Sequence, residues 1–421
     1  MTDRTPPSRA PIEQRLREAG LPPLARLSWL EIDLDALRGN LDALRSVVGP
    51  GVRVEPVVKA DAYGHGAVPV ARALEAAGAD GLCVATMDEA VELRDAGISA
   101  PLLVLYPVPV DWLGEAAARG IAVVLGAGDG AAETLAAIRA APTGTRPAVE
   151  VHVEVETGLG RGGVLPADAV TTIAAVRATP GARLAGVWTH LAAADDDGLT
   201  IEQDRRFTQA LAPLADAVAW GGAPGSETRR HSSGSGGVLG DAIPRWEAVR
   251  TGIAVYGLVP DDLVPPASTS AAAEALRPVM AAFARPVRVV ELPEGHGVSY
   301  GPTYVTTRPS RIATLAVGYA DGWRRYLSDR AVALVRGVRV PLVGRVAMDA
   351  VMADVTDVPG EPVTARDEFV LLGAQGDERI TAFDLAAAGG TISYEVVTGM
   401  SRRLARVYHA AGSPVEVRTL S

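Results

Sequence analysis

The sequence predicts an α/β fold, in which an N-terminal (β/α)8 TIM barrel is followed by a C-terminal mainly-β domain. In the first part of the chain, short apolar runs of strand-like composition alternate with alanine-rich segments of helical spacing, which is typical of a parallel barrel. From about residue 277 onward, apolar runs follow one another without long helices between them, as in an antiparallel β domain. We therefore expect an N-terminal extension over 1–27, a barrel over 28–265 and a β domain over 266–421.

Eight apolar runs are expected to form the barrel strands. They lie at 53–58, 81–85, 102–106, 121–125, 148–155, 184–190, 227–232 and 249–255. Helices are predicted between most of them, for instance in VPVARALEAAG and TLAAIRAA. The run at 227–232 is polar and is the least clear of the eight.

The segments on either side of the barrel have a different character. Residues 1–27 are rich in Pro and Arg, and we expect them to be flexible or loosely docked. The next run, SWLEIDLDAL, alternates in polarity and could supply a strand that crosses over to the β domain. A stretch rich in Pro, Ser and Ala over 260–276 ends the barrel pattern. The runs that indicate the β domain follow it, and they are RPVRVVEL, SRIATLAVGY, AVALVRGVRVPLVGR and EFVLLG.

Composition excludes several classes of protein. The 421 residues are 48% hydrophobic and 21% charged, as in an ordinary soluble globular chain. A net charge of −10 argues against nucleic acid or an anionic membrane as partner. No run of apolar residues is long enough to span a membrane, and the polar N-terminus lacks the apolar stretch of a secretory signal. The single cysteine, Cys83, excludes an intramolecular disulfide and fits the cytoplasm. The histidines show no metal-ligand spacing, so we expect no metal site.

Lys59, in the run VVKADAYGHG, is the only lysine of the chain, and every other residue of the 40 Lys+Arg is arginine. Arginine stays protonated up to about pH 12, so it cannot act as a base or attack a carbonyl. A lysine amine can do both when its surroundings lower its pKa. We therefore interpret Lys59 as a residue retained for chemistry.

Other candidate residues follow the later strands, and barrel enzymes carry their chemistry on the loops at the carboxyl ends of the strands. They are Arg161 in VEVETGLGRGG, His190 in GVWTHLAAAD, Ser235 in HSSGSGG, and Arg250 and Gly252 in AVRTGIAVYG. Because the carboxyl ends of all eight strands meet at one rim, these residues are expected to converge there with Lys59. The run GLGRGG looks like a phosphate-binding loop, but it lacks the Gly-Lys-Ser ending of a nucleotide site.

Eight motifs in this order resemble alanine racemase, a pyridoxal 5'-phosphate (PLP) enzyme of the barrel fold type. They are VVKADAYGHG, VETGLGRGG, THLAAAD, VRTGIAVYG, GVSYGPTY, VGYADG, GRVAMD and SYEVVTGMSRRLARVY. The resemblance covers about residues 29–410 and leaves out the extension. It implies a homodimer that interconverts L-alanine and D-alanine, with each active site shared between the subunits.

The resemblance also implies a role for two bases. Lys59 would hold PLP as a Schiff base and then act as one catalytic base, and Tyr300, in GVSYG, would be the other, supplied by the partner subunit. Racemisation removes the α-proton from one face of a planar carbon and returns it on the other, which one base on each face achieves directly.

The remaining site residues come from the same match. The phosphate would lie among Tyr63, Ser235, Tyr394 and the backbone N–H groups of Gly252 and Ile253. Arg250 would face the pyridine nitrogen, and His190 with Arg250 would link Tyr300 to the cofactor by hydrogen bonds. Arg161 would bind the cofactor's phenolic oxygen or the substrate carboxylate. The N–H of Met348, from the partner subunit, and Tyr319 would also contact the substrate, and Tyr319 and Tyr394 would narrow the entrance. Residues that match an entrance corridor, or that form ordinary ion pairs, are Asp195, Arg325, Arg345 and Asp349.

Two positions depart from the family pattern. Many members carry a carbamylated lysine seven residues before the substrate arginine, whereas this chain has Glu154 there. We expect the Glu154 carboxylate to orient Arg161 by direct or water-bridged pairing. The family's Asn-Ser pair before the phosphate is Gly234–Ser235 here, so one amide contact is missing.

Three other functions stay open at this point. The first is a broader racemase for serine or other small amino acids, since motifs do not report pocket size. The second is a non-catalytic PLP-binding barrel protein, although such proteins lack the β domain and its tyrosine. The third is a lysine Schiff-base aldolase, which the predicted phosphate ligands argue against. Whether the product is D-alanine for peptidoglycan or serves a specialised pathway is equally open.

Overall fold

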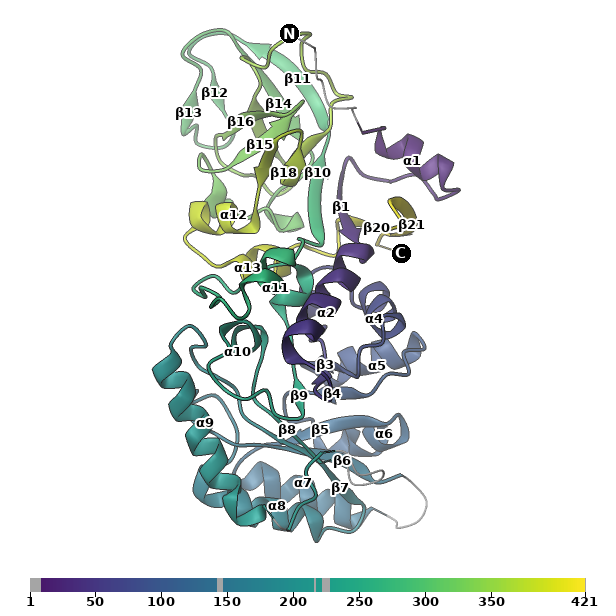
Figure 1. The fold of residues 1–421 in the computed structure, drawn as a ribbon. Coiled ribbons are helices and arrows are strands. Elements are labelled where there is room, and N and C mark those ends of the chain that lie inside the picture. The colour runs from purple at the N-terminus through teal and green to yellow at the C-terminus, as the bar shows by residue number, and fades with distance from the viewer. Residues whose placement is uncertain (1–8, 142–146, 216, 222–227, 421) are drawn as a thin grey trace. The chain divides into compact units, whose positions relative to one another are not determined.

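The computed structural model describes residues 9–141, 147–215, 217–221 and 228–420. The chain divides into two compact units. The barrel unit comprises Ala36–Ala62 and Ala67–Arg277, and the β unit comprises Met1–Asp35, Tyr63–Gly66 and Pro278–Ser421. Figure 1 shows the elements of both.

The barrel unit is built on eight parallel strands, which confirms the predicted barrel. They are β2 (Arg53–Val54), β3 (Leu82–Val84), β4 (Leu102–Val104), β5 (Ile121–Leu125), β6 (Val149–Glu154), β7 (Ala182–Trp188), β8 (Arg229–His231) and β9 (Ala248–Val249). Their order is β2-β9-β8-β7-β6-β5-β4-β3. A parallel bridge between Val57 and Cys83 joins the first strand to β3 and closes the barrel. Figure 1 shows helices around the outside of these strands.

The helices of this unit lie between the strands, as expected. They are α2 (Leu34–Val48), α3 (Lys59–Tyr63), α4 (Ala67–Ala76), α5 (Met87–Asp95), α6 (Leu113–Ala118), α7 (Asp129–Ala140), α8 (Ala169–Arg177), α9 (Asp197–Leu211), α10 (Ser235–Gly240) and α11 (Ser270–Ala275), with short 3-10 helices at Val110–Trp112, Pro166–Asp168, Ala212–Leu214 and Ile253–Tyr256. The polar run at 227–232 does contain a strand, β8. The prediction of a strand over 249–255 was wrong for most of that run, because β9 ends at Val249 and a 3-10 helix (η4) begins at Ile253.

The β unit contains a large, mainly antiparallel sheet. Its strands are β1 (Ser28–Asp33), β10 (Met280–Ala284), β11 (Pro286–Leu292), β14 (Ser310–Leu315), β15 (Val332–Val335), β16 (Val338–Val343), β17 (Val351–Asp354), β18 (Phe369–Gln375), β19 (Glu378–Ile380), β20 (Ala405–Ala410) and β21 (Ser413–Arg418). A separate hairpin pairs β12 (Gly297–Val298) with β13 (Tyr304–Val305). The helices that accompany the strands are α1 (Ile12–Glu18), α12 (Ala382–Gly389) and α13 (Ser393–Thr398), with short 3-10 helices at Tyr319–Asp321 and Arg325–Leu327.

Strand β1 belongs to this sheet although it precedes the barrel in sequence. It pairs antiparallel with β10 and parallel with β20. Trp29 stacks on Phe283 of β10, with ring centroids 5.5 Å apart, and both side chains are buried. The alternating run noted in the sequence therefore joins the two ends of the β unit.

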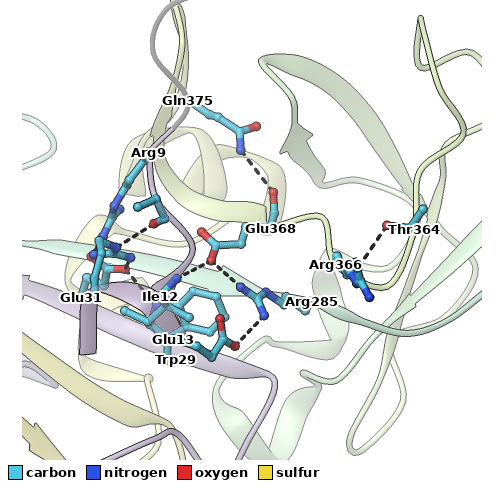
Figure 2. A network of polar contacts seen from close by, with 12 residues as sticks. Arg9, Ile12, Glu13, Trp29, Glu31, Arg285, Thr364, Arg366, Glu368 and Gln375 are labelled. Carbon is cyan, nitrogen blue, oxygen red and sulfur yellow. Dashed lines mark hydrogen bonds and ion pairs between the residues drawn. The ribbon is translucent and has the colours of Figure 1, made fainter. Parts of the chain in front are cut away.

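The N-terminal helix α1 (Ile12–Glu18) is packed against the β unit. Ile12 and Leu16 are 0% and 1% exposed, so one face of the helix is core. Figure 2 shows the polar contacts around its first turn. The N–H of Ile12 donates to Glu368 (2.9 Å), and Arg285 donates to Glu13 (2.5 Å) and Glu368 (2.8 Å). The expectation of a loosely docked segment is therefore wrong for these residues, because the Pro- and Arg-rich composition concealed an amphipathic helix. Residues 1–8 lie outside the described part of the chain.

In the described ranges, no helix combines the length and the apolar character that crossing a membrane would require.

Candidate active site

Lys59 lies at the carboxyl end of the first barrel strand, where the backbone leaves the sheet. The N–H of Val58 donates to the carbonyl of Cys83 (2.8 Å), and Lys59 is the next residue. Ala60, Asp61 and Ala62 then have φ of 52°, 56° and 53°, so the turn is left-handed. Each such non-glycine residue costs roughly 1–2 kcal/mol relative to a right-handed turn. Strain of this kind persists only where neighbouring contacts hold it, and it is concentrated at functional sites.

Two carboxylates of the barrel unit hold the turn. Glu89, in the first turn of α5, accepts from the N–H of Ala60 (2.6 Å) and from the N–H of Ala85 (2.8 Å). Asp61 accepts from the N–H of Ala67 at the start of α4 (2.9 Å). The backbone on both sides of the lysine is therefore fixed.

The glycines that end the motif VVKADAYGHG are required by close contacts within the β unit. A Cβ on Gly64 would lie 2.2 Å from the carbonyl oxygen of Val397, and one on Gly66 would lie 1.9 Å from the Tyr408 hydroxyl. Arg406 donates to the Gly64 carbonyl (2.9 Å), and Tyr408 donates to the carbonyl of His65 (3.0 Å). The glycines that follow the lysine in sequence are therefore explained by close packing, which leaves no room for a side chain.

The half-buried Lys59 amine has a lowered pKa. Burial is the larger cause, because it penalises the charged ammonium, and the positive charge of Arg161 acts in the same direction. A lowered pKa increases the fraction of free amine, which is the form that attacks a carbonyl or accepts a proton.

Arg161 lies in the loop after β6, above Glu154, the last residue of that strand. Glu154 is 7% exposed. A Cβ on Gly162 would lie 3.1 Å from the Glu154 Oε2, and one on Gly163 would lie 2.9 Å from its Cγ. The two glycines therefore leave room for a carboxylate directly under the loop.

The direct pairing expected between Glu154 and Arg161 is not present, since neither a hydrogen bond nor an ion pair joins them in the described residues. They interact electrostatically at longer range. Burial raises the pKa of Glu154, and the charge of Arg161 opposes that rise. Glu154 could therefore orient Arg161 only through a bridging water molecule or through its charge at longer range.

Arg250 follows β9 and lies buried at the centre of a hydrogen-bonded network. Its guanidinium donates to the carbonyl of Thr189 (2.9 Å) and to Nδ1 of His190 (3.4 Å). It also donates to Nδ1 of His231. The ring of Trp188 lies 4.5 Å from its Cζ, which adds a cation–π contact.

Two buried histidines that the sequence did not single out extend this network. His231 Nε2 lies 2.9 Å from His152 Nδ1. A guanidinium has only donors, so His231 Nδ1 must accept, and the protonated Nε2 of His231 donates a hydrogen bond to Nδ1 of His152. Burial and Arg250 lower the pKa of His231, and burial with nearby arginines lowers that of His152. Both rings are therefore neutral supports for Arg250. What could have revealed them in the sequence is that each is a polar residue within a barrel strand, His152 in β6 and His231 in β8.

His190 is neutral for the same reasons. Burial, followed by the charge of Arg250, lowers its pKa to about 3. Burial lowers the pKa of Arg250 to about 10, so the guanidinium remains charged at neutral pH. The pair therefore presents a fixed positive charge beside an uncharged imidazole.

Of the residues predicted to bind the phosphate, Ser235 and Ile253 keep a donor that is free within the described part of the chain, whereas the N–H of Gly252 is used by Ser235. The Ser235 hydroxyl, at the start of α10, accepts from the N–H groups of Gly252 (2.9 Å) and Ala254 (3.1 Å). Its own proton therefore points elsewhere. The N–H of Ile253 has no acceptor in the described residues. A hydroxyl and a free backbone N–H fit the oxygens of a phosphate group, and the half-buried Lys59 amine fits an aldehyde. These residues are therefore suited to PLP.

The other predicted site residues belong to the β unit and fall into two groups. Tyr63 and Tyr394 lie together, with ring centroids 6.3 Å apart. Tyr300, Tyr319 and Met348 are 74%, 38% and 52% exposed.

Two hydrogen bonds connect the surroundings of the three exposed residues, one between backbone groups and one from the side chain of Ser299. The N–H of Tyr319 donates to the carbonyl of Ala347 (3.0 Å), which places it beside Met348. Ser299, next to Tyr300, donates to the carbonyl of Arg345 (2.6 Å). The residues next to Tyr300 and Met348 therefore meet the same segment of the β unit, at Arg345 and Ala347.

The corridor candidates have mixed surroundings. Asp349 pairs with Arg403 (2.7 Å), as an ordinary ion pair would. Arg345 lies against Gly301, where a Cβ would be 2.7 Å from its Nη1.

The fold and the site together define a PLP-dependent barrel enzyme that carries a second, mainly-β unit. Comparison with known proteins makes the assignment specific. Residues 32–260 match the family model of the alanine racemase N-terminal domain, and residues 279–408 match that of the C-terminal domain. The chain belongs to the alanine racemase family, whose members use PLP to interconvert L-alanine and D-alanine, and it shares that activity.

Individual relatives agree with the family models. An alanine racemase from Symbiobacterium thermophilum is 43% identical over 91% of this chain and 97% of its own length. One from Halothermothrix orenii is 39% identical over the same shares. The crystal structure of alanine racemase from Bacillus anthracis with bound L-Ala-P has a TM-score of 0.83 at 34% identity, covering 94% of this chain and 99% of that one. The enzyme from D-cycloserine-producing Streptomyces lavendulae has a TM-score of 0.79 at 38% identity, covering 92% and 98%.

Proposed function

We propose that Lys59 and Tyr300 are the two bases of this racemase, and that Tyr300 acts in the site of a partner subunit of a homodimer. The role of Lys59 is supported by its position at the carboxyl end of a barrel strand and by its lowered pKa, and it is the only lysine of the chain. The role of Tyr300 in a partner subunit is supported by its exposure, because a side chain that is 74% exposed is available to another chain. Met348 and Tyr319, which are also exposed, would contact the substrate from that side.

The barrel residues would bind and orient the cofactor and the substrate. Lys59 would hold PLP, which when bound withdraws electrons from the α-carbon and so acidifies the α-proton. The phosphate would be held by the Ser235 hydroxyl, which itself accepts from the N–H of Gly252, by the N–H of Ile253, and by Tyr63 with Tyr394. Arg161 would bind the substrate carboxylate.

The Lys59 Nζ and the Tyr300 Oη would then exchange protons with opposite faces of the α-carbon. Arg250 would face the pyridine nitrogen. It keeps its own proton and therefore does not protonate that nitrogen. The neutral His190 would connect Arg250 to Tyr300, because an imidazole accepts at one nitrogen and donates at the other.

Glu154 would orient Arg161 through its charge, so Glu154→Gln should raise the KM for alanine about two- to tenfold, with a smaller change in kcat. The pH dependence tests the cause. Burial raises the pKa of Glu154, so the carboxyl group of the native enzyme should be neutralised as pH falls, and KM should rise. The Gln variant should lose this part of the profile. Equal KM values for the two enzymes across the pH range would reject the role of Glu154.

Substrate breadth tests the proposal against its closest alternative, a racemase for serine or other small amino acids. We expect α-deuterium exchange and loss of chirality in D2O to be fastest with alanine among a panel of L- and D-amino acids. Faster exchange with a larger amino acid would favour the broader racemase. A purified protein that gains no visible absorption with PLP would instead revive the Schiff-base aldolase.

We further propose that the enzyme works in the cytoplasm and supplies D-alanine for peptidoglycan. Support for the compartment comes from Cys83, which is free and buried, with a pKa that burial raises. The family's usual product supports the pathway.

A further inference from the structure

Arg161 is held in an unusual way for a residue expected to bind a carboxylate. It is exposed, and in the described part of the chain its guanidinium takes part in no hydrogen bond or ion pair. Its defined partner is an aromatic ring. The Cζ of Arg161 lies 5.7 Å from the centroid of the Tyr106 ring, within the range of a cation–π contact.

Tyr106 lies just after β4, on a segment with little freedom. The N–H of Leu105 donates to the carbonyl of Val84 (2.8 Å), so the strand pairing continues to the residue before Tyr106. Pro107 follows at once, and it packs so closely on the next loop that a Cβ on Gly126 would lie 3.0 Å from its ring. The tyrosine backbone is therefore fixed.

The Tyr106 side chain is 44% exposed, which is high for an aromatic residue next to a barrel strand. A core aromatic would be buried, and this one lies against a charged group at the rim. The contact leaves the donors of Arg161 free, because a ring under the plane of a guanidinium does not use its N–H groups. A hydrogen-bonded carboxylate in the same place would use them.

We propose that Tyr106 is a positioning residue for Arg161, with its ring supporting the guanidinium so that the N–H fork faces the substrate carboxylate. The inference rests on the proposed carboxylate-binding role of Arg161. Glu154 acts from beneath the loop by charge, and Tyr106 acts from the side by contact, so the two contributions are separable.

Substitutions of Tyr106 test this directly. Tyr106→Leu should raise the KM for both L- and D-alanine about two- to fivefold, as expected for one exposed cation–π contact. The inhibition constant of propionate, a carboxylate without an amine, should rise by the same factor. The kcat should stay within about twofold, because the contact is the same in the ground state and the transition state. Tyr106→Phe keeps the aromatic ring, so its KM, its inhibition constant for propionate and its kcat should all stay close to those of the native enzyme.

Trp112 provides a matched control, since it is also 44% exposed and lies in the same connection after β4. Trp112→Leu should change neither KM nor propionate binding. Arg161→Leu should raise the KM and the inhibition constant of propionate by about tenfold or more, and adding Tyr106→Leu to it should have no further effect.

Three outcomes would overturn the inference, and they differ from one another. If Tyr106→Leu has no effect while Arg161→Leu does, the carboxylate site is correct and Tyr106 does not position it. If Tyr106→Phe is as impaired as Tyr106→Leu, the hydroxyl matters and the ring contact does not. If Arg161→Leu itself leaves KM and propionate binding unchanged, it is the proposed role of Arg161 that fails.

Discussion

Lys59→Arg will abolish racemisation and the covalent attachment of PLP in the same step. The chain has no other lysine, so no side-chain amine remains that could take over either task. We expect activity to fall by about 10³-fold or more. Borohydride reduction of the protein with PLP, followed by mass measurement, should show the added cofactor in the native chain and not in the variant.

A lysine placed elsewhere is the matched control for that experiment. Arg205 is an exposed residue of α9 that pairs with Glu202, and a lysine can replace it there. Arg205→Lys in the Lys59→Arg background should restore neither attachment nor activity. Reduced cofactor on the Lys59→Arg chain would mean that PLP is held by a group other than this lysine.

Tyr300→Phe will have the second large effect, and the loss will be restricted to proton transfer. Racemisation should fall about 10²- to 10⁴-fold, the usual contribution of one acid–base group. Covalent PLP should remain at the native level, because the attaching amine is untouched. In D2O, α-deuterium should still enter one enantiomer of alanine, since the base on the other face is intact.

Tyr304 serves as the control for this tyrosine, because it lies four residues further along and has a structural partner. Its hydroxyl donates to Asp354 (2.7 Å), and burial together with that carboxylate raises its pKa to about 12. Tyr304→Phe should lower stability by about 1 kcal/mol and leave racemisation unchanged. Deuterium exchange lost equally from both enantiomers in Tyr300→Phe would contradict a two-base assignment.

The sequence predicted the barrel well because its strands are apolar and its helices rich in alanine, so both periodicities are visible. It failed where the contacts that decide structure are distant in sequence. The strand expected through residue 255 stops at Val249, because Ile253–Tyr256 turns into a 3-10 helix. Helix α1 was missed since its buried side chains, Ile12 and Leu16, are two apolar residues in a charged segment.

The candidate site shows the same division. Lys59 was found through composition alone, and the residues after the strands were found because barrel enzymes share one rim. His152 and His231 were overlooked since nothing in their spacing reveals that they meet, at 2.9 Å, behind Arg250. Tyr106 was overlooked for a similar reason, because the approach of its loop to that of Arg161 depends on how neighbouring strands are paired.

A mixed dimer tests the central claim most directly, namely that Lys59 and Tyr300 act in one site from two subunits. Lys59→Arg and Tyr300→Phe chains would be co-expressed with different tags, and the mixed dimer isolated with both. If Tyr300 acts across the interface, one of the two sites contains both native bases, and the dimer should have about half of the native activity. If Tyr300 acts within its own subunit, every site lacks one base and the mixed dimer will be as inactive as its parents, which would contradict the account.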